Sequence, residues 1–461
     1  AAHAVNVEYQ TQIVDMVRRA LSRCGYPFRR SKVAILGTDG LLKKSWSKAE
    51  SPPIIESLRK RGARVSLYPG EDGSQPWVQM VGDRAKVENS LLRAVAKANC
   101  TVVALPKSCA LELDADQLAT EMNRPGAICD LTRVLEASNV ERAGLFYTTI
   151  GVIGTGFWGE NQVRVLRQSR MADLVAICDT NEKRAREIGT KYGVPWHTDV
   201  DKFLRVPGLE AVTVCTPTQT HLKVGLLAIE SGKNLLVEKP MTGEERAADR
   251  LVNSARKANV KLLVGFIERF NPGVRAVKKM LMQKIVGNVI IATGRRVARW
   301  PLRIGDVGVV KDTAIHDIDA MRYLFGKEVL AVFAQTGSLR RRSYEDYAEM
   351  MLRFDGGTTG FIDANWLTPR KVRTLIITGS EATINLDYIT QEITLENSKQ
   401  LVKPYTPWAE PLKLELDSFV TTIIQDTLGS PSGDDALRAI RVCDAALRSG
   451  KSKTLVTLSG S

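Results

Sequence analysis

TTIGVIGTGFWGENQVRVL, residues 148–166, is the stretch that decides the fold. An apolar run leads directly into Gly154, Gly156 and Gly159, spaced as GxGxxG, and a helical pattern follows. Asp179 ends the next apolar run, 20 residues after Gly159. A strand, a glycine turn, a helix and a later acidic residue in this order predict a dinucleotide-binding βαβ unit.

Each residue of this pattern has a predicted contact with the dinucleotide. The first glycine permits the tight turn, the second brings the backbone close to the pyrophosphate, and the third packs the helix on the strand. Backbone N–H groups of the helix start, at Phe157 and Trp158, complete the phosphate site. Asp179 would accept the ribose hydroxyls, which favours NAD, while Lys183 and Arg184 leave NADP open.

The composition describes the setting of this site. The 461 residues are 44% hydrophobic and 25% charged, which is typical of globular domains. No apolar run reaches the roughly 20 residues of a membrane helix, and the N-terminus has no signal-peptide pattern. The seven cysteines are scattered without a CxxC pair, which favours reduced thiols and a cytoplasmic location.

The net charge of +14 raises the question of a nucleic-acid partner. The basic residues are dispersed, and the tightest groups are GRRVAR (294–299) and LRRRS (339–343). Without interleaved aromatic residues or a basic tail, this pattern favours anionic small molecules over nucleic acid. A merely soluble basic surface is the alternative for most individual charges.

The chain divides into three predicted domains. Residues 1–147 alternate short apolar runs with helical patterns, which predicts a Rossmann-like α/β domain. Residues 148–267 repeat that pattern more strongly as a Rossmann dinucleotide-binding domain. Residues 268–461 alternate along longer strands, which predicts an α+β domain with a large open, mostly antiparallel sheet.

Two strand ends in the dinucleotide domain carry polar residues. VEKP (237–240) places Glu238 and Lys239 at the carboxyl end of a strand, where open parallel sheets bind ligands. CTPTQTH (215–221) ends the preceding strand, and four of its residues are expected along the cofactor channel: Thr216, Pro217, Thr218 and His221. Helix capping is the alternative for Thr218, and it is the preferred interpretation of Thr220.

KDTAIHDID, residues 311–319, contains one of only four histidines. A metal site, a capped helix start and an acid/base centre are the three alternatives. Asp312 and His316 are four residues apart on one helical face, too few for the three protein ligands of a catalytic metal, so no metal is predicted. As a base, neutral His316 would accept a hydroxyl proton while Asp312 orients the imidazole and Lys239 stabilises an alkoxide.

Residues 148–450 resemble the Gfo/Idh/MocA oxidoreductases. The matching stretches are GVIGTGFWG, CTPTQTH, VEKP, GFIERFNP and DTAIHDID. The resemblance implies a Rossmann domain followed by an open-sheet domain, and reversible oxidation of a sugar or cyclitol hydroxyl. It places the catalytic lysine at Lys239 and the family's Asp–x–x–x–His pair at Asp312 and His316. Members usually pair through the open sheet, so a homodimer or homotetramer is expected.

Within the family, GFIERFNPGVR and RRVARWPLRIGDVGVVKDTAIHDID most resemble UDP-N-acetylglucosamine 3-dehydrogenases and related nucleotide-sugar 3-oxidases. The resemblance implies oxidation of a UDP-N-acetylhexosamine at C3, with a sugar aminotransferase as a possible downstream partner. The substrate candidates are Arg269, Asn271, Arg295, Arg296 and Arg303. A solvated position on a strand face is the alternative for each arginine. A free-sugar, inositol or UDP-hexuronic-acid dehydrogenase and a non-catalytic nucleotide-binding regulator are the rival functions.

Residues 8–147 resemble the UDP-binding C-terminal domain of UDP-glucose/GDP-mannose dehydrogenases. The matching stretches include KVAILG, ESPPIIESLRKRGARVSLYPG and MNRPGAICDLTRVLEA. The segment GTDGLLKKSWSKAESP departs from that family's pattern, although Lys43, Lys44 or Lys48 could still meet a phosphate. Because that family's NAD domain and catalytic cysteine are missing, a docking or oligomerising role is the alternative.

Overall fold

The computed structural model describes most of the chain in two compact units. The first unit comprises residues 1–149 and 168–173, and the second comprises 150–167 and 174–461. The described residues are 13–14, 17–18, 20–21, 24–37, 53–70, 81–105, 113–124, 126–130, 135, 149–169, 172–206, 209–300, 306–340 and 343–458. Lys43, Lys44, Lys48 and Arg303 therefore lie outside the described residues.

The first unit contains a five-stranded parallel sheet in the order β3-β2-β1-β4-β5. Its strands KVAIL (32–36) and CTVV (100–103) are short, mostly apolar and almost entirely buried, as expected for strands covered on both faces. The strands are β1 (Lys32–Leu36), β2 (Arg64–Tyr68), β3 (Lys86–Val87), β4 (Cys100–Val103) and β5 (Ala127–Asp130). The helices are α2 (Pro53–Lys60), η1 (Gly82–Arg84), α4 (Leu91–Val95) and α5 (Ala115–Glu121). This architecture confirms the predicted Rossmann-like α/β fold.

The second unit begins with a six-stranded parallel sheet in the order β11-β10-β9-β6-β7-β8. This is the doubly wound order, which brings the carboxyl ends of β6 and β9 together where the winding reverses. The strands are β6 (Thr149–Ile153), β7 (Asp173–Cys178), β8 (Trp196–His197), β9 (Ala211–Val214), β10 (Asn234–Val237) and β11 (Leu262–Val264). The helices are α7 (Phe157–Gln168), α8 (Glu182–Tyr192), α9 (Val200–Leu204), α10 (Thr218–Glu230) and α11 (Glu245–Ala258).

A nine-stranded sheet completes the second unit, in the order β19-β18-β17-β16-β12-β15-β14-β13-β20. Only the central pair β12·β15 is parallel among its described pairs. The strands are β12 (Val289–Arg299), β13 (Val329–Gly337), β14 (Tyr347–Phe354), β15 (Thr359–Asn365), β16 (Leu367–Gly379), β17 (Thr383–Asp387), β18 (Ile393–Glu396), β19 (Leu401–Val402) and β20 (Val456–Thr457). The predicted large, mostly antiparallel sheet is confirmed.

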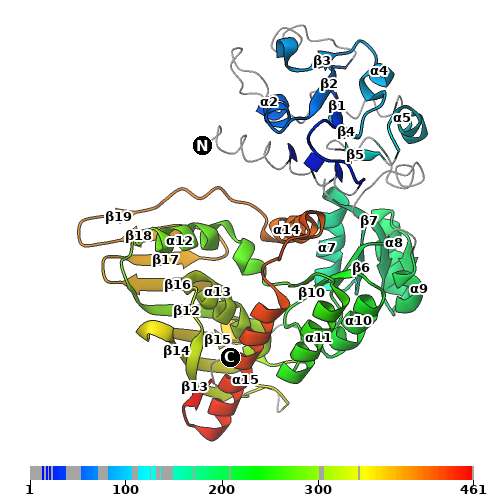
Figure 1. The fold of residues 1–461 in the computed structure, drawn as a ribbon. Coiled ribbons are helices and arrows are strands. Elements are labelled where there is room, and N and C mark those ends of the chain that lie inside the picture. The colour runs from blue at the N-terminus through cyan, green and yellow to red at the C-terminus, as the bar shows by residue number, and fades with distance from the viewer. Residues whose placement is uncertain are drawn as a thin grey trace. The chain divides into compact units, whose positions relative to one another are not determined.

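Helices cover one face of this sheet, where α12, α13 and α15 lie against the strands (Figure 1). The remaining elements are η3 (Ile267–Phe270), α12 (Pro272–Met282), η4 (Val310–Ala314), α13 (Ile315–Phe325), η5 (Asp355–Gly357), α14 (Pro411–Gln425) and α15 (Gly433–Ser452). The buried apolar residues of the Rossmann sheet, the covered sheet face and α15 form one continuous core. That shared core fixes the two sheets as neighbours and positions the cavities between them.

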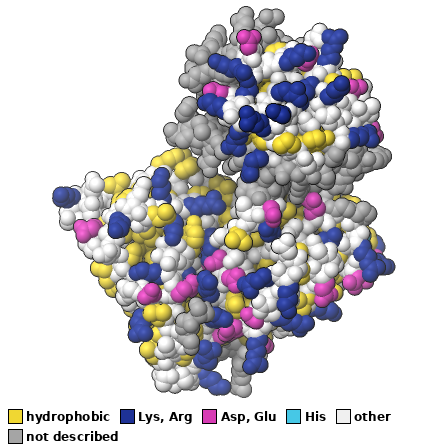
Figure 2. Space-filling model, viewed as in Figure 1, with side chains coloured by type: hydrophobic (Ala, Val, Ile, Leu, Met, Phe, Trp, Pro, Cys, Tyr) yellow, Lys and Arg dark blue, Asp and Glu magenta, His cyan; other side chains and the backbone are white. Residues whose placement is uncertain are grey.

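The opposite face of the nine-stranded sheet is open. A row of directly opposed residues crosses it, from Ile376 through Thr293 and Phe361 to Met351 and Phe333. Ile376, Phe361 and Phe333 are each about two-fifths exposed. Elsewhere on the viewed face of the second unit, basic and acidic side chains are interspersed (Figure 2). Among the described residues, no helix is long and apolar enough to cross a bilayer.

Candidate active site

A cleft of about 850 Å³ lies at the carboxyl ends of β6, β7, β9 and β10. Most of the predicted cofactor residues line it: Gly154, Gly156, Phe157, Trp158, Asp179, Thr216, Pro217, Thr218, His221 and Glu238. Gly159 lies one turn into α7, behind this surface. The cleft therefore occupies the place where doubly wound sheets bind a dinucleotide.

The three glycines differ in what their missing side chains leave room for. Gly154 has φ +87°, and a Cβ there would come within 2.8 Å of the Cys215 and Thr216 backbone. A Cβ on Gly159 would clash with the Gly154 carbonyl oxygen. A Cβ on Gly156 would meet nothing within 4 Å, although Gly156 lines the cleft. The chain itself thus requires two of the glycines, while the space at Gly156 fits a dinucleotide phosphate.

Asp179 follows β7 and lines the cleft beside the glycine turn. Its carboxylate accepts hydrogen bonds from Thr155 N (2.8 Å) and Thr155 Oγ1 (2.9 Å), and from Asn181 N (2.9 Å). Arg184 Nε donates to Thr155 O, so its guanidinium lies over the same turn. These bonds hold the carboxylate at the cleft edge, where it can accept the ribose hydroxyls of NAD.

His221 ties two of the cleft-lining loops together. Its Nδ1 lies 3.0 Å from Pro240 O and its Nε2 lies 2.7 Å from Thr216 O. Burial lowers the pKa of His221, although both carbonyl contacts oppose that shift. A neutral imidazole has one N–H, so His221 donates to one of these carbonyl oxygens, and its contacts with both hold the loop after β9 close to the loop after β10. The preferred capping interpretation of Thr220 is wrong: Pro217 is the N-cap of α10, and Thr220 Oγ1 lies inside the first turn and donates to Pro217 O at 2.7 Å.

A second cavity of about 140 Å³ adjoins the cleft. Trp158, Lys239 and Asp312 line both cavities. The smaller cavity is further lined by Ile267, Glu268, Asn271, Arg296, Thr313, His316, Arg373, Tyr388 and Pro411. Lys239, which follows strand β10 of the Rossmann sheet, and His316, on helix α13, thus line one cavity beside the dinucleotide cleft.

Lys239 is held at the junction of the two cavities by Asp312. Its Nζ donates to Asp312 Oδ1 (2.9 Å) and to Asp312 O (2.7 Å), and its side chain is 6% exposed. An ammonium group has three donors, so one N–H remains for a ligand in the cavity. Glu238 holds the same turn in place, because its carboxylate accepts hydrogen bonds from Gln162 Nε2 (2.8 Å) and from Lys239 N (3.2 Å).

Asp312 lies in a π-helical turn, η4, that leads into α13. The predicted one-face placement of Asp312 and His316 is thus reached through a π turn, a feature frequent at functional sites. From the sequence, Asp312 was expected to orient the imidazole of His316. The structure adds a correction, since its carboxylate also forms the ion pair with Lys239. Asp317 and Asp319 do not line the cavity, and both are buried in ion pairs with arginines.

A buried ion cluster forms the floor of the small cavity. Arg296 binds Asp317 through Nε (2.6 Å) and Glu268 through Nη1 (2.9 Å), and its guanidinium lies 4.7 Å from the Tyr388 ring. Asn271 caps α12 and donates to Tyr388 O (2.9 Å) and Glu268 Oε2 (3.2 Å). The predicted substrate residues Asn271 and Arg296 therefore both line this cavity.

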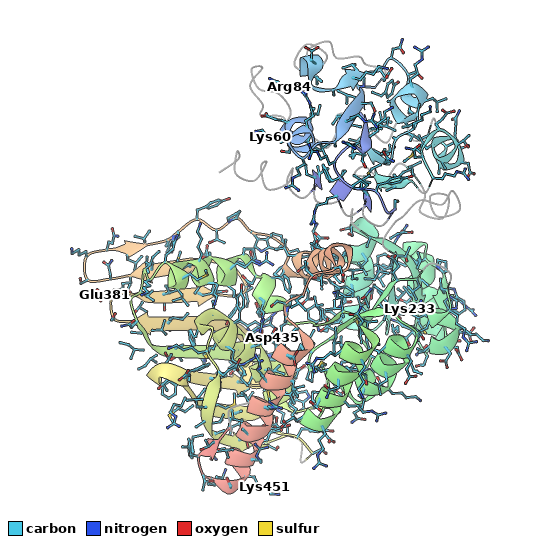
Figure 3. The ribbon with its side chains drawn as sticks, in the orientation of Figure 1. Lys60, Arg84, Lys233, Glu381, Asp435 and Lys451 are labelled. Atoms are coloured by element: carbon cyan, nitrogen blue, oxygen red, sulfur yellow. The ribbon has the colours of Figure 1, made fainter. Side chains whose placement is uncertain are left out.

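Arg269 does not reach either cavity, which corrects its predicted substrate role. Its guanidinium forms ion pairs with Asp319 (2.6 Å) and Asp435 (3.2 Å) and stays 7% exposed. Asp435 projects from the first turn of α15 (Figure 3). Arg269 is thus a structural residue that joins η3, α13 and α15.

Arg295 is also corrected, because alternation along β12 puts it on the face opposite Arg296. It is half exposed and pairs with Asp363 at 2.9 Å on the open sheet face. The solvated-strand alternative is therefore the right one for Arg295. Arg303 lies outside the described residues.

Several polar residues at or near the site were not predicted from the sequence, among them Arg373, Asp306 and Glu415. Arg373 lines the small cavity, and Asp306 accepts a hydrogen bond from Thr218 N at 2.6 Å in the cleft wall. Glu415 on α14 is 2% exposed, and burial, followed by Glu238 and Glu268, raises its pKa well above the usual range. A signal for Arg373 exists, since its position in RTLII is in phase with the buried Leu375 and Ile377.

Metal-binding potential is absent from the described part of the chain, where no three His, Cys, Asp or Glu side chains gather as a ligand set. The six described cysteines are free, and burial raises the pKa of Cys178 to about 12. With a dinucleotide cleft beside a lysine and a histidine, the fold and site define an NAD-dependent oxidoreductase.

Comparison with known proteins identifies the family. Residues 148–266 match the description "Oxidoreductase family, NAD-binding Rossmann fold", and residues 274–385 match "GFO/IDH/MocA C-terminal domain". The chain belongs to the Gfo/Idh/MocA oxidoreductase family, as the sequence motifs predicted. It is an NAD-dependent dehydrogenase of the sugar-oxidising type.

Several relatives match over the second unit. Myo-inositol 2-dehydrogenase of Thermotoga maritima is 30% identical over 67% of this chain and 98% of its own length. UDP-N-acetylglucosamine 3-dehydrogenase of Acidithiobacillus ferrooxidans is 26% identical over 66% of this chain and 96% of its own length. Levoglucosan dehydrogenase in complex with NADH and levoglucosan shares the fold with a TM-score of 0.64 at 22% identity, over 68% of this chain and 99% of that one.

Proposed function

We propose that the protein oxidises the C3 hydroxyl of a UDP-N-acetylhexosamine to a 3-keto sugar with NAD. The observation that carries the proposal is the shared cavity of Lys239, Asp312 and His316, which meets the dinucleotide cleft at Lys239. NAD, when bound in the cleft, supplies the hydride acceptor. The glycine turn, α7 and Asp179 are the residues that would hold it.

His316 is the proposed base of the reaction. The hydroxyl O–H bond breaks as its proton passes to the imidazole, and the carbon's C–H pair leaves as hydride, so the products are a ketone, NADH and one proton. A positioned base of this kind contributes roughly 10²–10⁴-fold to the rate. The 9% exposure of His316 limits its contact with bulk water.

Lys239 is the proposed electrostatic group. Its remaining N–H can donate to the substrate oxygen while Asp312 fixes the direction of the ammonium group. Because negative charge grows on that oxygen as its proton leaves, the ammonium stabilises the transition state more than the neutral alcohol. Asp312 thus orients Lys239, and it lines the same cavity as His316.

The UDP-hexosamine assignment is supported by the 26% identical relative of that activity and by the cationic residues Arg296 and Arg373 at the small cavity. A second candidate, oxidation of a neutral cyclitol, is supported by the 30% identical myo-inositol relative. A 3-keto product would be a substrate for a sugar aminotransferase, which is the proposed downstream partner.

NADH formation at 340 nm tests the proposal directly. Wild-type protein should reduce NAD with UDP-N-acetylglucosamine or its epimer, and Lys239→Ala or His316→Ala should abolish turnover while NADH binding persists. Reduction of NAD with myo-inositol but with no UDP-sugar would select the second candidate. Cofactor binding without turnover on any sugar would favour the alternative that the protein is a non-catalytic nucleotide-binding regulator.

We also propose that two copies of the chain associate through the open sheet face. The exposed row of Ile376, Phe361 and Phe333 supports this, because exposed apolar rows on a sheet favour a covering partner. Sedimentation of wild-type protein and of Phe361→Glu tests it, and a monomeric wild type would refute it.

A further inference from the structure

Arg373 occupies an unusual position in the nine-stranded sheet. It lies on β16 directly opposite Arg296 on the neighbouring strand β12. Like charges directly opposite each other destabilise a sheet. Arg373 also shares its face with Leu375 and Ile377, which are fully buried, so it points to the helix-covered side and lines the small cavity.

The two arginines differ in how well their charges are compensated. Arg296 has carboxylates at 2.6 and 2.9 Å, from Asp317 and Glu268. Arg373 forms an ion pair with the same Glu268, but the distance from its Nη1 to Glu268 Oε1 is 3.9 Å, which is beyond hydrogen-bond distance. Among the residues that the structure describes, Arg296 therefore holds the shared carboxylate, and Arg373 retains most of its donors for another acceptor.

The charges around the small cavity have a positive excess. Lys371 lies two residues before Arg373 on β16, where the pairing with β12 becomes irregular, and it is exposed. The cavity is lined by the cations Lys239, Arg296 and Arg373 and by the carboxylates Asp312 and Glu268. Asp317 pairs with Arg296 without lining the cavity, and Lys371 is close enough to Arg373 to interact with it. Burial, followed by Arg296, lowers the pKa of Arg373 to about 10, and Arg373 lowers the pKa of Lys371. In both shifts a neighbouring arginine contributes repulsion, which agrees with the excess of cations that line the cavity.

We propose that Arg373, supported by Lys371, binds an anionic group of the substrate and so selects charged sugars over neutral ones. The inference rests on the proposed function and deepens it by naming the feature that excludes free sugars and cyclitols. A guanidinium matches phosphate and carboxylate oxygens bidentately. The group is therefore either a phosphate of the nucleotide or the carboxylate of a hexuronic acid.

The test compares kcat/KM for charged and neutral substrates. The substrates are UDP-N-acetylglucosamine, its 6-carboxylate derivative, N-acetylglucosamine and myo-inositol. Arg373→Gln should lower kcat/KM for charged substrates about 10- to 150-fold, mostly through KM, and leave the neutral ones unchanged. Arg373→Lys should recover part of the loss. A loss on both UDP-sugars assigns the phosphate, and a loss confined to the 6-carboxylate derivative assigns the carboxylate.

Controls separate recognition from folding. Arg295→Gln, on the opposite sheet face, should match wild type on every substrate. NADH affinity and the melting temperature of Arg373→Gln report an intact fold. If that variant does not fold, Arg373→Lys replaces it, and a raised KM confined to charged substrates is the expected result.

The outcomes distinguish this inference from the proposed function. Equal losses on charged and neutral substrates, or no loss in Arg373→Gln while wild type oxidises UDP-N-acetylglucosamine, overturn the inference and leave the function. Oxidation of myo-inositol but of no charged sugar overturns both. Arg373-dependent oxidation of a different anionic sugar keeps the inference and removes the UDP-hexosamine assignment.

Discussion

Replacement of Lys239 by methionine removes the proposed electrostatic group with little change in side-chain volume. In wild type the ammonium and the Asp312 carboxylate are 2.9 Å apart with side chains 6% and 10% exposed. The loss of one preorganised donor to a developing oxyanion lowers kcat by about 10²–10³-fold. We expect Lys239→Met to lose at least that much in NADH formation.

The same substitution should also destabilise the protein. It leaves the Asp312 carboxylate buried without its cation, and breaking a buried ion pair costs about 3–5 kcal/mol. Lys239→Met combined with Asp312→Asn removes the isolated charge, so most of the lost stability should return. Activity should not return, because the double variant still lacks the ammonium group.

Steady-state NADH formation and urea denaturation of the single and double variants measure both effects. NADH fluorescence checks that the cleft still binds cofactor. If the double variant regains both stability and turnover, Lys239 acts only by neutralising Asp312, and the proposed electrostatic role is refuted.

Two further predictions concern the cleft and the open sheet. Gly156→Ala should weaken NADH binding at an unchanged melting temperature, whereas Gly159→Ala should unfold, and an unchanged NADH affinity in Gly156→Ala would contradict the phosphate placement. Burial and Asp363 raise the pKa of Glu349 to about 7 from 4.5. The protonated form is thus favoured in the folded state, and its stabilisation is lost as pH rises through 7. At pH 4.5, Glu349→Gln should have the same melting temperature as wild type. At pH 8.5, its melting temperature should exceed that of wild type, and equal melting temperatures at pH 8.5 would argue against the raised pKa.

The parts of the site that follow from local patterns could be predicted. The glycine turn, Asp179 and Lys239 are fixed by the ends of short apolar strands, and parallel strand ends converge on one edge. The placement of His316 beside Lys239 could not be predicted from strand ends alone, because its helix α13 packs on the nine-stranded sheet and not on the Rossmann sheet. The family motifs supplied that step, and the shared cavity now brings His316 beside Lys239.

The arginines show where sequence reasoning ends. Arg269 pairs with Asp319, 50 positions away in the sequence, and with Asp435 on the last helix. No local sequence pattern predicts those two partners. Arg295 and Arg296 are adjacent on β12, so their side chains face opposite sides of the sheet. The alternation around the buried Val297 does not show which of the two arginines is buried with carboxylate partners. Arg373 was missed because its role depends on the register of β16 against β12.

The fate of the C3 hydrogen tests the central claim most directly. UDP-N-acetylglucosamine carrying deuterium at C3 should transfer that deuterium to the nicotinamide, so the NADH isolated by mass spectrometry is one mass unit heavier. Unlabelled NADH from this substrate would show that the hydride comes from another carbon, and the proposed reaction at this site would be wrong.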